Sequence, residues 1–427
     1  MIILKKIVVL LIILTYTLSS IVYAANETDS SSLENNFVTE KAKVVNIISD
    51  VSKEDYNNTQ AHQNLKQIVE IQILSGEHKG QVLTVENNLS NHVYYDILLE
   101  KGDRITVAVE NAIGNNEPNI YISGFERDRY ELYMVLIFIF LLIFIGGFKG
   151  VKAVFSLALS ITIIIFMILP MILRGYSPIL SSVFGAVIIT TLTLFIIAGI
   201  NIKSVSAIIG TASGVIIAGV LAYVIGSLAN LTGLSSQEAN MLMYVPQNIS
   251  FDYRGILFAG IIIGTLGAVM DIAMSIASSM HEIREIEPNI STRNLISAGI
   301  NIGRDVMGTM TNTLVLAYTG TSIPLMLVFI AYDYPLVEIL NMDLIATEIV
   351  RSIAGSIGLV LAIPFTAMTC GIIINHSASI KRHERMRKLR EEYEDDLRDM
   401  YKKIKSESPQ SDQENNIPAD IESLEEE

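Results

Sequence analysis

The chain has 427 residues, of which 51% are hydrophobic. A soluble protein of this length cannot bury so large an apolar fraction, so the composition excludes an ordinary soluble class and indicates an integral membrane protein. The net charge of −14 comes from two acidic stretches, residues 26–131 and 406–427, and nothing in this distribution indicates a nucleic-acid partner. The one cysteine, Cys370, excludes a disulfide framework and a four-cysteine or Cys2His2 zinc site.

Residues 1–24 have the pattern of a secretory signal. Lys5 and Lys6 precede the apolar run Ile7–Leu14, and Val22-Tyr23-Ala24 places small or branched residues at a cleavage position. A cleaved signal peptide and an uncleaved signal anchor both fit, and both place the following residues outside the cytoplasm. Residues 25–39 are polar and are predicted to form a flexible tether.

Residues 40–130 are predicted to form a small exported β-rich domain. Short alternating runs are separated by turn residues, and helix signals are few. Such a pattern favours a small antiparallel, OB-like barrel. The expected strands are Lys41–Ile48, Gln67–Leu74, Gln81–Val85, Arg104–Glu110 and Asn119–Ile122.

Residues 131–376 are predicted to form a transmembrane helical domain of about seven helices. Ile323–Tyr332 is apolar but too short to cross, so we expect a re-entrant segment near 321–334. The expected spans are Leu132–Phe148, Val154–Leu173, Ile179–Ile200, Val205–Leu228, Ile256–Met280, Asn301–Thr319 and Ile349–Ile374.

The distribution of lysine and arginine predicts the orientation. Seven crossings place Lys149, Lys152, Lys203 and the basic run at 381–390 on the inner side, in agreement with the positive-inside rule. The N-terminal domain is therefore expected to be extracytoplasmic and the C-terminus cytoplasmic. Residues 377–405 are predicted to form a charged cytoplasmic helix, and residues 406–427 an acidic disordered tail.

Polar groups at membrane depth concentrate in the last three spans. Charged and amide side chains are costly in a bilayer and commonly mark a transport path. The candidate transport or polar intramembrane residues are Asp271, Ser275, Asn301, Arg304, Asp305, Thr309, Asn312, Thr313, Glu348 and Arg351. Small residues on the same helical faces are expected to pack against other helices, and these are Gly260, Gly264, Gly267, Gly308, Gly355 and Gly358.

Each of these candidates also has a structural interpretation. Asp271 sits in a glycine-rich stripe, where a buried aspartate can simply bond a neighbouring helix. Arg304 and Asp305 are able to snorkel or to form a local ion pair, and Glu348 and Arg351 lie near a helix end. The sequence holds no Walker A, nucleophile-elbow or HExxH motif, so we expect no catalytic residue, metal or cofactor, and no enzyme activity.

Three strings in this region resemble the YibE/F family of bacterial multi-pass membrane proteins. They are Gly264-Thr265-Leu266-Gly267-Ala268-Val269-Met270-Asp271, Asn301-Ile302-Gly303-Arg304-Asp305-Val306-Met307-Gly308 and Glu348-Ile349-Val350-Arg351-Ser352. The β-rich stretch Leu74–Asn87 is also similar to that family. The resemblance implies a multi-pass protein of a bacterial plasma membrane and gives no substrate.

The favoured hypothesis is a transporter or permease-like protein of unknown substrate that uses the polar stripes of its last three spans. The alternative is a membrane-anchored sensor or assembly factor whose exported domain binds a partner. The expected partners are the lipid bilayer and further copies of the chain in a homo-oligomer.

Overall fold

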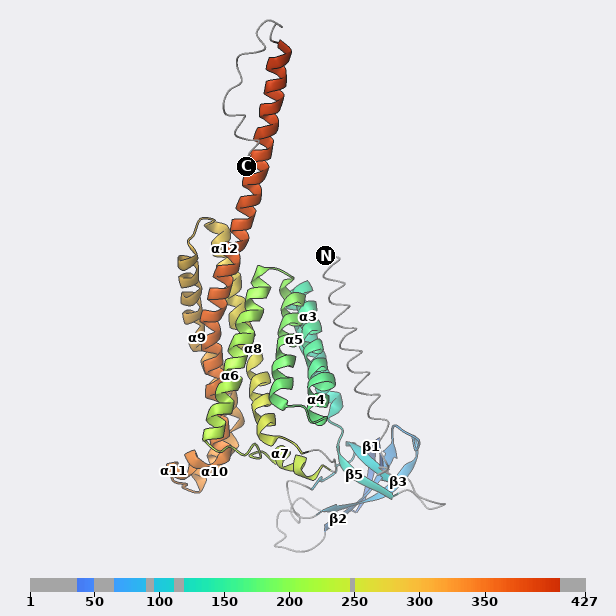
Figure 1. Cartoon of the computed structure of the whole chain (residues 1–427). Helices are drawn as coiled ribbons and strands as arrows, with labels where there is room; N and C mark the ends of the chain where they lie inside the picture. The colour runs from blue at the N-terminus through green and yellow to red at the C-terminus, as the bar shows by residue number, and fades with distance from the viewer. Residues whose placement is uncertain (1–36, 50–64, 90–95, 111–118, 246–249, 408–427) are drawn as a thin grey trace. The chain divides into compact units, whose positions relative to one another are not determined.

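The computed structural model describes residues 37–49, 65–89, 96–110, 119–245 and 250–407 (Figure 1). The signal segment, the predicted tether up to residue 36 and the acidic tail from residue 408 lie outside the described residues. The chain divides into two compact units, Ile21–Val154 and a second that contains Phe155–Glu427. Each unit is described by itself.

The first unit contains a five-stranded antiparallel sheet. Its strands are β1 (Phe37–Ser49), β2 (Leu65–Ile73), β3 (Val82–Leu89), β4 (Arg104–Glu110) and β5 (Asn119–Phe125). The order is β3-β2-β1-β4-β5, and the edge strands β3 and β5 approach each other. The sheet is therefore curled into a half-barrel around the long central strand β1.

Alternating side chains of β1, β2 and β4 form the core of the half-barrel. Val44, Ile71 and Val107 have no exposed surface, as expected when one face of an antiparallel sheet is covered. The antiparallel pairing places Ala42 opposite both Ile73 on β2 and Ile105 on β4. The predicted strand Arg104–Glu110 matches β4 end to end, and β1 begins at Phe37, within the stretch assigned to the tether.

A buried carboxylate fixes the loop between β2 and β3. Glu40 of β1 is 1% exposed, and its Oε1 accepts a hydrogen bond of 2.9 Å from the backbone N–H of Glu77. His78 Nδ1 lies 3.3 Å from the same oxygen. The loop reaches this position because Gly76 has φ +84°, a conformation that favours glycine.

The sheet is joined to the following helix by ion pairs. Lys41 of β1 contacts Glu126, at 3.1 Å, and Asp128, which begins helix α3 (Asp128–Ile163). Arg104 Nη1 lies 3.3 Å from the second oxygen of Glu126, a side chain that is only 4% exposed. Hydrogen bonds to Asp128 and Glu126 raise the pKa of Lys41 above its usual value.

The chain turns sharply inside α3. Gly147 has φ 54° and ψ −131°, which no α-helix accommodates, so the stretch consists of two helical arms. A Cβ atom added at Gly150 would lie 2.0 Å from the carbonyl oxygen of Leu142, eight residues earlier. In a straight helix these residues are about 12 Å apart along the axis, so the second arm folds back against the first at this point.

The second unit is a helical bundle. After α3, a π-helical segment η1 (Ile164–Ile168) and α4 (Leu169–Leu173) precede α5 (Pro178–Ala198) and α6 (Ile202–Leu228). Pro170 lacks the N–H that an α-helix would bond to Phe166, which accounts for the irregular turn. The short α7 (Gln237–Met241) and a 3-10 turn, Leu242–Tyr244, lead to α8 (Tyr253–Ile286).

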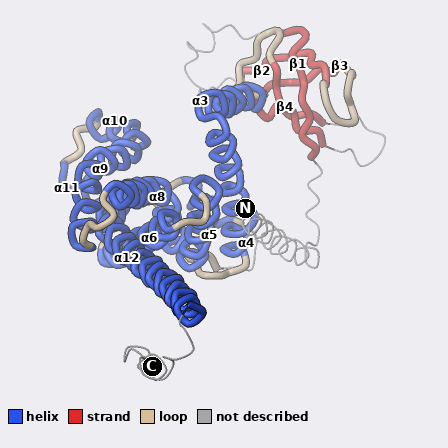
Figure 2. Tube along the Cα trace, turned by 90° about the horizontal axis from the view of Figure 1, so that it is seen from above, coloured by secondary structure: helices blue, strands red, loops and turns tan. Residues whose placement is uncertain are grey.

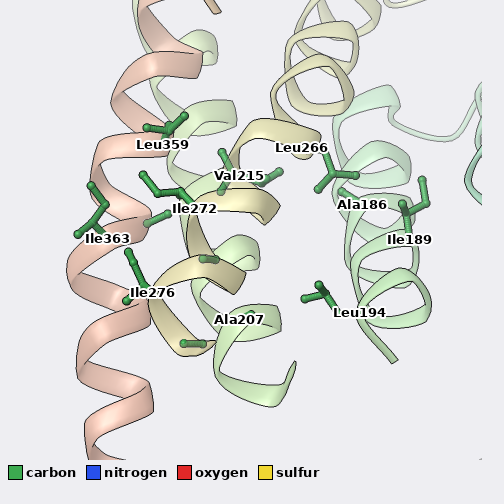
Figure 3. Packing of buried hydrophobic residues seen from close by; sticks show 14 of the residues in the cluster. Ala186, Ile189, Leu194, Ala207, Val215, Leu266, Ile272, Ile276, Leu359 and Ile363 are labelled. Atoms are coloured by element: carbon green, nitrogen blue, oxygen red, sulfur yellow. The ribbon is translucent and has the colours of Figure 1, made fainter. Parts of the chain in front are cut away.

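Helix α8 lies among the other long helices. It contacts α5, α6, α9 (Thr292–Thr321) and α12 (Asp343–Glu407), and Figure 2 shows it between them in the view from above. Figure 3 shows Ile272 and Ile276 of α8 between α6 and α12, and Leu266 on the side of α5. One face of α8 therefore packs in the apolar core.

The helix that follows α8 is broken near its end. α9 and α10 (Ile323–Ala331) are bent by 58° at Ser322. Pro324 cannot continue the α9 hydrogen-bond ladder, because it has no N–H to bond to Gly320. Segment 321–334, predicted to be re-entrant, therefore contains this bend and the short helix α10, which α11 (Leu336–Asn341) follows.

The last helix is continuous over 65 residues. The apolar span and the predicted charged helix 377–405 form one element, α12, which extends beyond the rest of the bundle (Figure 1). Among the described residues, five helical stretches are long and apolar enough to cross a membrane, or six if α9 and α10 count as one span. This count takes Asp128–Leu173 as one stretch, whereas the sequence predicts two spans there.

Candidate functional site

A cavity of about 200 Å³ lies where α9 and α10 meet the beginning of α12. We call it the α9–α12 cavity. The bend lies at its edge, because Ser322 and Met326 of α10 are both part of its wall. The wall is mainly apolar, and its polar lining residues include Tyr318, Ser322, Glu348 and Ser352.

An ion pair borders the α9–α12 cavity. Arg351 Nη1 lies 2.8 Å from Glu348 Oε1, one turn earlier on α12, and the two side chains are 29% and 20% exposed. The guanidinium carbon of Arg351 is 6.0 Å from the ring centroid of Tyr318 on α9, within the range of a cation–π contact. The pair is therefore held from two helices.

Three polar atoms beside the α9–α12 cavity are buried and have no hydrogen-bond partner in the part of the chain that the structure describes. They are Glu348 Oε2, Arg351 Nε and Ser352 Oγ. A buried polar group without a partner costs about 1–3 kcal/mol, more when it is charged. Of these three residues, Glu348 and Ser352 line the cavity, so the wall contains a carboxylate and a hydroxyl that lack a partner among the described residues.

Tyr318 owes its position to a glycine on α8. A Cβ atom at Gly264 would lie 2.8 Å from the Tyr318 hydroxyl oxygen. Glycine at this position therefore lets the phenol lie against the backbone of α8. The same ring contacts Arg351, so one side chain of α9 links α8 to α12.

The other polar candidates lie elsewhere, on the surface of the bundle. All of them are exposed, and none lines the α9–α12 cavity. We call this surface the outward polar face. It consists of Asp271 and Ser275 on α8 and of Asn301, Arg304, Asp305, Gly308, Thr309, Asn312 and Thr313 on α9.

The side chains of the outward polar face make few contacts among the described residues. The Thr309 and Thr313 hydroxyls donate to carbonyls of their own helix, Val306 and Thr309. Arg304 Nη1 lies 3.4 Å from Asn301 Oδ1. Among the described residues, no ion pair involves Asp271, Arg304 or Asp305.

The glycines expected to pack fall into two groups. Gly355 lies against Thr265 of α8, and Gly358 lies 2.7 Å, measured from an added Cβ, from the carbonyl oxygen of Gly214 on α6. These two allow α12 to approach its neighbours closely. Gly260, Gly267 and Gly308 have no atom of the described chain within 4 Å of an added Cβ.

The sequence indicated Glu348 and Arg351 as candidate polar intramembrane residues near a helix end and Ser352 on the face of Glu348, and it did not single out Tyr318 or Ser322. The one available signal was the spacing of Glu348 and Ser352, which puts both on one face of a helix. Within the described residues, no group of three or more His, Cys, Asp or Glu side chains is placed to hold a metal ion. Cys370 is buried, with its sulfur 3.9 Å from the Ala277 carbonyl oxygen.

Two family models match the chain. The model described as YibE/F-like protein matches residues 134–376, and the model described as YibE/F family N-terminal domain matches residues 35–125. The chain matches no curated protein and no solved structure.

Proposed function

The chain belongs to the YibE/F-like protein family, as its sequence motifs predicted, and from this premise we propose that it is a membrane permease for a small solute. The N-terminal half-barrel lies outside the cytoplasm, the C-terminus lies inside, and the bundle crosses a bacterial plasma membrane. The chain has no catalytic role in this proposal.

One observation carries the proposal. Glu348 Oε2 and Ser352 Oγ are buried beside a cavity of about 200 Å³ and have no hydrogen-bond partner among the described residues. Folded proteins rarely leave such atoms unsatisfied, and a bound molecule or ion is one explanation of an exception. A solute that enters the α9–α12 cavity supplies the missing hydrogen bonds.

The chemistry of the cavity limits the solute. A carboxylate oxygen accepts from an ammonium or hydroxyl group, and the largely apolar wall suits a short hydrocarbon part. A small amphipathic amine or alcohol meets both conditions. A bare inorganic anion does not fit the cavity, because the nearest cation, Arg351, is already paired with Glu348.

We propose seven crossings for the bundle. The reversal at Gly147 divides Asp128–Leu173 into two arms, each near the length of about 20 residues that a crossing needs. The bent pair α9 and α10 provides one further crossing. An odd number of crossings agrees with the distribution of lysine and arginine.

The test uses the purified full-length protein and a panel of small amines and alcohols. A solute that binds the folded state raises the melting temperature as its concentration rises. We expect at least one panel member to stabilise the wild-type protein and to enter proteoliposomes that contain it. Glu348→Gln removes the charge that holds the solute and should weaken binding by about 1.5–3 kcal/mol.

The matched control is Glu338→Gln, because Glu338 is an exposed carboxylate on α11, outside the cavity. It should bind and transport as the wild type does. Equal binding and uptake by wild type and Glu348→Gln contradict the proposal.

The alternative function is a sensor or assembly factor. The observation that favours it is that the half-barrel belongs to a separate unit with its own apolar core. Normal cellular function of the half-barrel on an unrelated membrane anchor would establish this alternative and exclude the permease.

A further inference from the structure

The outward polar face carries charge at a depth where lipid is expected. Arg304 is 12 residues from the start of α9, about 18 Å along the helix, and Asp271 is about 22 Å from the end of α8. α8 and α9 are joined by the short connection between these two ends. The polar ends of the two helices lie beyond the predicted spans, so counted from the inner span ends at Met280 and Asn301, Asp271 lies about 14 Å deep and Arg304 about 5 Å deep in a hydrocarbon layer about 30 Å thick.

Exposure to lipid at this depth is unfavourable for every one of these groups. Charged side chains within a membrane face the protein interior or a water-filled space, or pair with one another. Arg304 and Asp305 are both exposed, and neighbours in sequence on a helix point in different directions, so they do not neutralise each other. None of the described residues of the bundle covers the outward polar face.

We propose that a second copy of this chain covers it, with α9 packed against α9 of the partner about a two-fold axis. Such an interface uses the same patch on both subunits, so every contact occurs twice. The Arg304 of each copy then meets an Asp305 of the other, and the chain supplies both members of the pair. A second copy is favoured because this face carries both the positive and the negative member of each pair.

The shape of the face fits this arrangement. Gly308 lies one turn beyond Arg304 and has open space where a side chain would stand. A glycine there lets two helix backbones approach closely, as in other membrane helix pairs. Asn312, one further turn along, is exposed, and its amide has both a donor and an acceptor for the same group of the second copy. Gly308 thus packs between copies and leaves the packing within the chain to other glycines.

The test measures the mass of the full-length protein in mild detergent, together with cross-linking in membranes. We expect a dimer. Arg304→Asp and Asp305→Arg each place like charges opposite each other and should raise the dissociation constant about 10-fold or more. The double variant Arg304→Asp with Asp305→Arg restores both pairs and should restore the dimer.

Cross-linking locates the interface independently of these charge reversals. In a Cys370→Ala background, Asn312→Cys should form a disulfide-linked dimer on mild oxidation. Ile216→Cys, on the exposed side of α6, is the matched control and should remain monomeric.

Four outcomes overturn the proposal. They are a wild-type monomer, a dimer linked through Ile216→Cys alone, a dimer that both charge reversals leave intact, and a double variant that is no better than the single ones. The last outcome means that the charges act within one chain, on water or on another protein. The proposal stands apart from solute binding, so loss of the dimer and loss of binding are separate results.

Discussion

At the scale of single residues, the contact between Gly76 and Glu40 is the most demanding in the half-barrel. A Cβ atom at Gly76 would lie 2.1 Å from Glu40 Oε1. An alanine there must displace a buried carboxylate and disrupt its hydrogen bond to the N–H of Glu77. Gly80 has a similar φ of +91° but open space around it. A substitution at Gly80 therefore adds backbone strain without a clash against a neighbouring side chain.

We predict that Gly76→Ala destabilises the half-barrel more than Gly80→Ala does, by at least about 1 kcal/mol. Both substitutions place a Cβ in the left-handed region, and that shared cost cancels in the comparison. The measurement is the urea-induced unfolding of a protein of residues 37–131, followed by circular dichroism. Equal losses for the two variants would show that Glu40 moves aside without cost.

At the residue scale, spacing indicated which side chains share a helix face. Helical spacing put Gly264, Gly267 and Asp271 on one face of α8, and the structure places them together on its exposed side. Spacing did not reveal which way that face points, because lipid and a protein core are equally apolar. Tyr318 was missed because its role depends on Gly264 and Arg351, which are distant in sequence.

At the scale of elements, Lys41 joins strand β1 to the beginning of α3. Hydrogen bonds to Asp128 and Glu126 raise its pKa. A raised pKa in the folded state means that the contribution to stability is fully present below the unfolded value, 10.5, and is lost as the pH rises through the folded value.

We therefore predict that Lys41→Met lowers the melting temperature of the protein of residues 37–131 at pH 7. The difference from the wild type should shrink above about pH 10.5. The effect should be small, because the Lys41 side chain is 41% exposed and solvent screens the pair. Lys66→Met, which removes an exposed pair with Glu86 on the same sheet, is the control. A difference that persists undiminished at pH 12 would rule out the ion pair as its cause.

The sequence located most elements but not how they join. Alternation identified β4 to the residue, and apolar length identified α5, α6 and α8. The turn at Gly147 lies where the apolar run ends before Lys149, so the sequence predicted two spans but not the tight approach of Gly150 to Leu142. The cavity was beyond prediction, because it depends on the 58° bend between α9 and α10.

At the scale of the whole molecule, the number of crossings determines where the two ends lie. Five or seven crossings place the half-barrel and the end of α12 on opposite sides of the membrane, and six place them on the same side. Lys101 and Lys402 are exposed and mark these two regions. The chain's one cysteine is buried, so a cysteine introduced at either position gives a specific signal.

We predict that an impermeant thiol reagent labels Lys101→Cys in intact cells and labels Lys402→Cys only after the membrane is opened. Lys149→Cys, beside the Gly147 turn, should also require an opened membrane if the two arms of α3 cross separately. Labelling of Lys402→Cys in intact cells would contradict the odd number of crossings.

The continuity of α12 has a mechanical consequence. Its apolar part ends near His376, and the helix continues to Glu407 without a break, a further length of about 46 Å. A straight, rigid helix of this kind pivots where it packs in the bundle, so a small tilt there moves its free end by a larger distance. If the apolar part tilts by about 5°, the far tip sweeps through about 4 Å. Because Glu348 and Ser352 belong to the same rod, any tilt of α12 that accompanies a change in the α9–α12 cavity is amplified at its opposite end.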